Sequence, residues 1–202
     1  MNSLMSRRAL PAALSVAFVL AGANFPARAQ ESKDDEAFQQ RLFGRALEGG
    51  QIHACFSRVY DAAHLAQHPK QNVRKANSDS NQPRYELRLG VTFRKSGAHF
   101  DSAGDCGSIH DTSDVGGSAG VAHCGVDCDG GSIDVAIKDA KSVLVSIPNG
   151  ARIWRAGSDN DSDQAKRFGA DDKVFRLDRV ALTECLRLAD DSKEKASMRR
   201  GQ

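Results

Sequence analysis

The chain has 202 residues, of which 28 are basic and 26 acidic, so its net charge is close to zero. Binding to a nucleic acid usually needs an excess of basic residues along one face, and this balance does not supply it. Aromatic residues make up only 6% of the chain and form no stacking motif. The composition therefore predicts no nucleic-acid partner.

The first 29 residues have the pattern of an export signal. Two arginines precede an apolar run, Ala9 to Ala21, which is too short to span a bilayer as a helix. Ala27-Arg28-Ala29 supplies the small residues of a cleavage site, so we expect cleavage between Ala29 and Gln30. The expected product is a periplasmic or secreted bacterial protein with no membrane span.

Residues 30–189 are expected to form one α+β domain, helical over 34–68 and β-rich over 72–185. Apolar residues recur at helical spacing from Phe38 to Leu47, and Gly49-Gly50 ends the pattern. A second helical pattern begins at Ile52 and ends no later than His68, because Pro69 disfavours helical backbone before it. Residues 190–202 are charged and are expected to fray.

The hydrophobic period changes to two after residue 84, where Tyr85 to Phe93 alternate with polar residues. A turn at Lys95-Ser96-Gly97 leads into a second strand that ends near Cys106, which predicts a hairpin. Further strands are expected at 121–129, 132–138, 143–147, 152–155 and 173–177. About seven short strands predict an antiparallel meander, closed as a barrel or folded as a sandwich, with the N-terminal helices packed on it.

Five cysteines enter an oxidising compartment: Cys55, Cys106, Cys124, Cys128 and Cys185. We expect two disulfides and one unpaired thiol. The favoured pairing joins Cys55 to Cys185, and Cys106 to either Cys124 or Cys128 between neighbouring strands. His123 and Cys124 are expected on opposite faces of one strand, so the cysteines are read as half-cystines rather than metal ligands.

One helical stripe carries candidate metal ligands. Asp61, His64 and His68 fall at positions i, i+3 and i+7, and the two histidines have the i, i+4 spacing that can share a metal ion. His53 lies one further stripe position away. The competing interpretation is a solvated helix face, which polar stripes usually form. No cofactor is predicted beyond a weakly bound divalent metal ion.

Catalytic signatures are missing from the sequence. Only the unpaired thiol, placed near His99, His110 or His123, could form a nucleophile and base pair. The acidic run Asp159 to Asp163 begins like a calcium loop but lacks its glycine and closing glutamate, so it is interpreted as a solvated turn.

Two short segments resemble parts of exported proteobacterial proteins of unknown function. They are Tyr60 to Pro69 and Asp171 to Asp178, together about a tenth of the chain. The resemblance implies periplasmic export and no particular activity. In the second segment, Phe175 and Leu177 are expected to point inward and Arg176 to pair with Asp178.

The sequence favours a non-enzymatic binding module for a small ligand or an envelope protein. Its long loops, Gly107 to Gly120 and Gly157 to Asp172, are the expected binding surface, because loops on a rigid sheet commonly carry binding residues. The alternatives are a metal-binding protein that uses Asp61, His64 and His68, and a thiol-dependent or hydrolytic enzyme that uses the unpaired cysteine.

Overall fold

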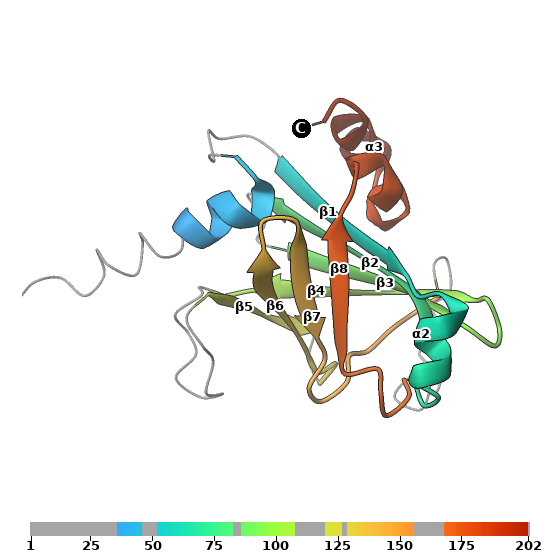
Figure 1. Cartoon of the computed structure of the whole chain (residues 1–202). Helices are drawn as coiled ribbons and strands as arrows, with labels where there is room; N and C mark the ends of the chain where they lie inside the picture. The colour runs from blue at the N-terminus through green and yellow to red at the C-terminus, as the bar shows by residue number, and fades with distance from the viewer. Residues whose placement is uncertain are drawn as a thin grey trace, which may run out of the picture.

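The computed structural model describes residues 36–45, 52–82, 86–107, 120–126, 129–155 and 168–201. Eight antiparallel strands follow one another around a closed barrel, each paired with its neighbours in the chain (Figure 1). Of the two architectures that the sequence left open, the chain adopts the barrel. The strands are β1 (Ile52–Val59), β2 (Val73–Gln82), β3 (Glu86–Phe93), β4 (His99–Cys106), β5 (Val121–Val126), β6 (Ser132–Asp139), β7 (Ser142–Ser146) and β8 (Val174–Arg179).

Alternating side chains build the barrel wall, as the period of two predicts. In β3, Leu87, Leu89 and Val91 are buried within the main core, while Arg88 reaches out to the C-terminal segment. The predicted hairpin is confirmed as β3 and β4.

Strand β8 has the inward and outward residues that the sequence predicted. Phe175 and Leu177 are buried in the main core. On the outer face, the Arg176 guanidinium lies 3.1 Å from the Asp178 carboxylate.

The second predicted helix is wrong over its first half, where the chain forms β1. Ile52, Ala54 and Phe56 belong to the main core, whereas Cys55 belongs to a second cluster beneath the C-terminal segment. Because both faces of this strand are buried, apolar residues occur without the alternation that marks a half-buried strand. Within residues 52–68, only α2 (Ala62–Gln67) is helical, and it ends before Pro69.

Strand β2 was not predicted, because most of its residues are polar. Val73 and Ala76 pack in the main core, but Asn77, Ser78, Asp79 and Ser80 are also buried. Ser78 and Ser80 lie opposite the core residues Phe56 and Ala54 and so face the barrel interior, whereas Asp79 lies opposite Cys55 on the face covered by the C-terminal segment. The burial depends on contacts distant in sequence, so no local hydrophobic pattern reveals it.

A short segment, residues 151–155, completes the wall where β4 and β5 diverge. These two strands pair only over Gly104 to Cys106 of β4. Asp101 of β4 instead pairs with Trp154 through two backbone hydrogen bonds of 2.8 Å. The strand predicted at 152–155 is therefore an isolated bridge, and its fully buried Ile153 adds to the core.

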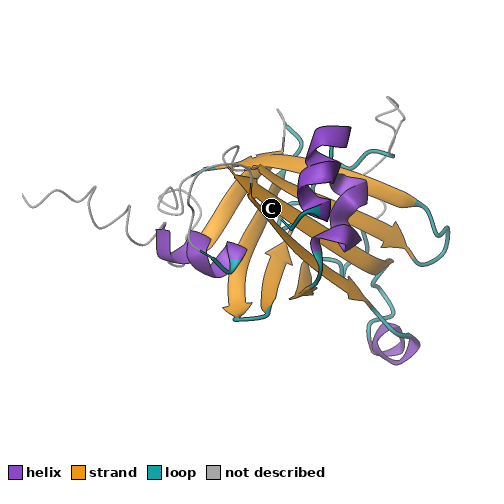
Figure 2. Ribbon diagram, turned by 90° about the horizontal axis from the view of Figure 1, so that it is seen from above, coloured by secondary structure: helices purple, strands orange, loops and turns teal. Residues whose placement is uncertain are grey.

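A helix at residues 36–43 lies at one end of the barrel (Figure 2). Phe38, Leu42 and Phe43 are buried there and join the main core. The space left between this helix and the barrel is only about 20 Å³. The remainder of the predicted helix, residues 46–47, lies outside the described residues.

The C-terminal segment forms an outer layer rather than a frayed tail. The 3₁₀ helix η1 (Leu182–Leu188) and α3 (Ser192–Arg199) lie across the outer face of the barrel near β1 and β2 (Figure 2). The tail prediction was wrong because the docking residues are mostly polar: Glu194, Ser197 and Met198 are buried. Gly90 permits the close approach, since a Cβ there would lie 2.8 Å from Leu188 Cδ2.

The expected disulfide Cys55–Cys185 is confirmed, and of the two partners left open for Cys106 the structure shows Cys124. The first ties β1 to η1, and the second joins directly opposed residues of β4 and β5. Cys128 lies outside the described residues. Within the described ranges, no helix is long and apolar enough to cross a membrane.

Removing the long-range disulfide should cost more stability than removing the short-range one. The Cys55–Cys185 loop spans 130 residues and the Cys106–Cys124 loop spans 18, so the chain-entropy model predicts a difference of about 1 to 2 kcal/mol. We expect Cys55→Ala/Cys185→Ala to lower the free energy of unfolding in urea more than the matched Cys106→Ala/Cys124→Ala pair. Equal losses would contradict a chain-entropy origin.

Candidate functional site

The residues of the stripe predicted to bind metal make hydrogen bonds and ring contacts that support α2. The Asp61 carboxylate accepts a 2.8 Å hydrogen bond from the His64 backbone and caps the helix. The His64 ring stacks between Tyr60 and His68, and its Nε2 lies 3.0 Å from Gln71 Oε1. Among the described residues, Asp61, His64 and His68 do not form a group of converging ligand atoms.

The two segments that carry the sequence resemblance lie against each other. The Tyr60 hydroxyl donates to the Arg176 carbonyl, and the Lys70 backbone donates to the Asp171 carboxylate. Asp172 is fully buried and accepts backbone hydrogen bonds from Gly169 and from the start of β2. Burial raises the pKa of Asp172, although these hydrogen bonds oppose the rise. The junction between α2 and β2 is thereby fixed to the chain before β8.

An open pocket of about 480 Å³ lies beside this junction and the β3–β4 turn. Its described lining residues are Asn72, Phe93, Arg94, Lys95, Ser96 and Arg155, none of which is acidic. Arg94 is positioned by a 2.7 Å hydrogen bond from its backbone N–H to the Asn72 carbonyl. The Arg155 guanidinium lies 5.6 Å from the centre of the Phe100 ring. The pocket can therefore attract anions.

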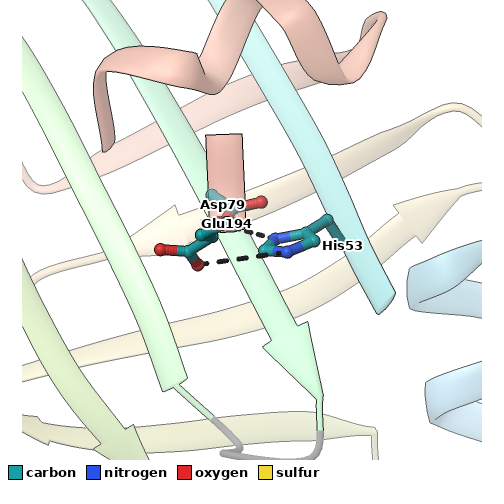
Figure 3. Close-up of side chains that lie close together, drawn as sticks. All are labelled: His53, Asp79 and Glu194. Atoms are coloured by element: carbon teal, nitrogen blue, oxygen red, sulfur yellow. Dashed lines mark hydrogen bonds and ion pairs between the residues drawn. The ribbon is translucent and has the colours of Figure 1, made fainter. Parts of the chain in front are cut away.

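A second candidate site is buried between the barrel and α3, where His53, Asp79 and Glu194 meet (Figure 3). His53 comes from β1, Asp79 from β2 and Glu194 from α3. His53 Nδ1 lies 3.1 Å from Asp79 Oδ2, and His53 Nε2 lies 3.9 Å from Glu194 Oε1. One ligand atom from each residue lies within 4.8 Å of the other two, so the group could hold a metal ion.

Arg88 of β3 organises the polar residues around this group. Its guanidinium donates to Glu86, Glu194 and Asp190, with the shortest distance to each between 2.6 and 2.8 Å, and to the Leu188 carbonyl at 3.0 Å. Glu194 Oε2 also accepts a hydrogen bond from the Asp190 backbone. The arrangement fixes the Glu194 carboxylate beside His53.

The electrostatic environment shifts two of these groups. Burial raises the pKa of Asp79, although the hydrogen bond and charge of His53 oppose the rise. Burial lowers the pKa of Arg88, but its hydrogen bonds to Glu86 and Glu194 outweigh that effect and leave the pKa above its ordinary value. Arg88 therefore remains charged, and the site holds more carboxylates than cations.

Residue spacing does not predict this group, although His53 is one stripe position from the predicted metal ligands. The sequence pattern predicts a helix at His53, a frayed tail at Glu194 and no strand at Asp79. The signal that links them is the β1–β2 register, which sets Cys55 opposite Asp79 and so brings His53 close to Asp79. The spacing of residues along the chain does not reveal that strand register.

The remaining predicted candidates have structural contacts or fall outside the description. His123 pairs with Asp134 on the outer face, and Cys124 is disulfide-bonded on the inner face, as the alternation predicted. His99 contacts Thr92. The acidic run 159–163, His110, Cys128 and most of both long loops lie outside the described residues.

Replacing Arg88 should destabilise the protein far more than replacing an exposed arginine. Arg88→Met leaves the buried carboxylate of Glu194 without its guanidinium partner, which typically costs about 3 to 5 kcal/mol. Arg176→Met, which removes the exposed pair with Asp178, should cost about 1 kcal/mol or less. Urea unfolding of both variants measures the difference, and similar small losses would show that the Arg88 contacts add little to stability.

The geometry is the basis for a functional proposal, because the comparisons supply none. No protein-family model matches the chain, and neither a curated protein nor a solved structure matches it.

Proposed function

We propose that the chain is an exported, non-enzymatic binding module that takes a small anionic ligand at the open pocket beside the β3–β4 turn. Two disulfides fit an extracytoplasmic protein, and cleavage of the signal segment between Ala29 and Gln30 remains part of the proposal. The observation that carries the proposal is that three cationic residues line one pocket: Arg94, Lys95 and Arg155.

The barrel interior leaves little space for a ligand in its described part. Large apolar side chains fill the main core, and the cavity between that core and the helix at 36–43 is about 20 Å³. A cavity needs roughly 10 to 15 Å³ of such space to hold one water molecule, so this cavity has room for a water molecule but not for an organic ligand. Within the described part of the barrel, a ligand therefore finds room on the outside or at the ends.

The open pocket has the size and chemistry that a small anion needs. Its volume of about 480 Å³ lies within the roughly 300 to 1,000 Å³ of typical ligand pockets. Arginine and lysine provide charged donors, and Asn72 and Ser96 add neutral polar groups. The Phe93 ring supplies an apolar surface. A small phosphorylated or polycarboxylate compound matches this combination.

The backbone around the pocket is held in place before any ligand binds. Asn72 donates its N–H to the buried Asp172 carboxylate, and Gly97 closes the β3–β4 turn with a hydrogen bond to Phe93. Gly97 has a φ of +64°, a conformation that other residues adopt with difficulty. A fixed arrangement lowers the entropy lost on binding.

Pyrophosphate and citrate, titrated by calorimetry at low ionic strength, test the proposal. We expect the two probes to bind, and Lys95→Gln/Arg155→Gln to weaken binding by at least about tenfold, because hydrogen bonds to charged groups contribute roughly 1.5 to 3 kcal/mol each. The control, Lys138→Gln/Lys141→Gln, makes the same change in net charge at the exposed β6–β7 turn.

The control variant should bind each probe as the wild type does. If both double variants weaken binding equally, the attraction comes from overall charge and not from the pocket. If neither probe binds the wild-type protein, the anionic-ligand proposal is wrong.

A further inference from the structure

We propose that His53, Asp79 and Glu194 bind one divalent transition-metal ion, best matched by Zn²⁺, which fastens the C-terminal helix to the barrel. Figure 3 shows the three side chains pointing toward one another between β1, β2 and α3. This site lies on the outer face of the barrel and shares no residue with the basic pocket. It also differs from the Asp61, His64 and His68 stripe of the sequence analysis.

Three buried polar atoms at this site lack a hydrogen-bond partner: His53 Nε2, Asp79 Oδ1 and Glu194 Oε1. Each residue is at least nine-tenths buried, with relative exposures of 4%, 0% and 5%. A buried polar atom without a partner typically costs about 1 to 3 kcal/mol, and two of these three atoms, His53 Nε2 and Glu194 Oε1, lie 3.9 Å apart. An ion shared by the three side chains would provide a partner.

The distance between His53 and Glu194 suits two ligands of one ion better than a hydrogen bond, whereas His53 Nδ1 is hydrogen-bonded to Asp79 Oδ2 at 3.1 Å. The 3.9 Å between His53 Nε2 and Glu194 Oε1 is too long for a hydrogen bond. Zinc binds nitrogen and oxygen at about 2.0 to 2.2 Å, which places two of its ligand atoms roughly 3 to 4 Å apart. The ligand atoms here lie within 4.8 Å of one another, so small side-chain rotations would bring them to one ion.

Charge also favours a divalent cation. Three side chains with little exposure, Asp79, Glu86 and Glu194, carry carboxyl groups near one guanidinium, that of Arg88. Negative charge in a region shielded from water is costly. A divalent cation bound among these carboxyl groups would offset that charge.

The donor types indicate which ions fit. One imidazole nitrogen and two carboxylate oxygens are ligands that zinc and neighbouring transition metals accept. Ca²⁺ requires six to eight oxygen ligands, and Mg²⁺ usually keeps several waters. The three enclosed donors therefore match neither of these two ions.

The position of the ligands gives the ion a structural role. Two ligands come from adjacent strands, and the third comes from a helix more than 100 residues later in the chain. Among the described residues, Met198 is the one α3 residue in the apolar cluster that joins the C-terminal segment to the barrel. A bound ion would add a strong link where apolar contact is small.

The experiment uses untagged protein from periplasmic expression, with Cys128→Ser to remove the remaining thiol. After dialysis against a chelator, Zn²⁺ is titrated by calorimetry and Co²⁺ by visible absorption. We expect one ion per chain. Glu194→Gln and His53→Gln should weaken binding by more than the roughly 10- to 100-fold that loss of an outer-sphere partner costs.

The control is His64→Gln/His68→Gln, which removes the two imidazoles of the α2 stripe and should leave binding unchanged. If this control abolishes binding, or if Glu194→Gln and His53→Gln do not weaken it, the proposed site is wrong. If the folded wild-type protein takes up no ion, the metal proposal is overturned.

A second measurement needs no variant and so does not depend on whether the substitutions fold. Hydrogen exchange of wild-type protein, with and without one equivalent of Zn²⁺, reports on α3 directly. We expect Zn²⁺ to slow exchange across Ser192 to Arg199 and to leave the strands far from the site, such as β6, unaffected. Unchanged exchange in α3 would contradict the fastening role.

Discussion

Closure of the barrel between β1 and β8 is the contact on which the rest of the structure depends. The two strands pair over only two residues each, Phe56 and Ser57 with Arg179 and Asp178. The Arg179 guanidinium lies 4.7 Å from the centre of the Phe56 ring, and it donates hydrogen bonds to carbonyls of the helix at 36–43. The chain after β8 then returns across β1, where Cys185 bonds Cys55. The barrel closure, the helix at 36–43 and the C-terminal outer layer therefore all make contacts with β1 or β8.

A closed, filled barrel moves the chemistry of this protein to its outer surface. Eight strands enclose a space that side chains can fill, and apolar residues do so here. Two clusters of charged side chains lie outside this core, one in the pocket beside the β3–β4 turn and one beneath α3. The first is open and positively charged, and the second is enclosed with excess negative charge. They are suited to ligands of opposite charge.

The sequence predicted elements where one face of a strand meets water, and it missed elements where both faces are covered. The β3–β4 hairpin was found because Leu87, Leu89 and Val91 alternate with polar residues. β1 was read as a helix because Cys55 is buried on the face opposite Phe56. β2 was missed because its buried Asp79 and Ser80 are polar. The Cys55–Cys185 disulfide was predicted, while the partner of Cys106 was narrowed to Cys124 or Cys128. The candidate metal group depends on a strand register and a docked helix that local patterns do not encode.

The C-terminal helix α3 is attached to the barrel mainly through polar contacts, so a bound cation would affect its attachment. Buried ion pairs gain little net free energy, because desolvation of the charges offsets their attraction. The contacts of Arg88 with Glu194 and Asp190 thus define where α3 sits more than they strengthen its attachment. The disulfide secures η1 but ends at Cys185, before α3 begins. The helix is consequently the part of the outer layer whose attachment depends most on charge, and Glu194 is the residue through which a bound cation would act on it.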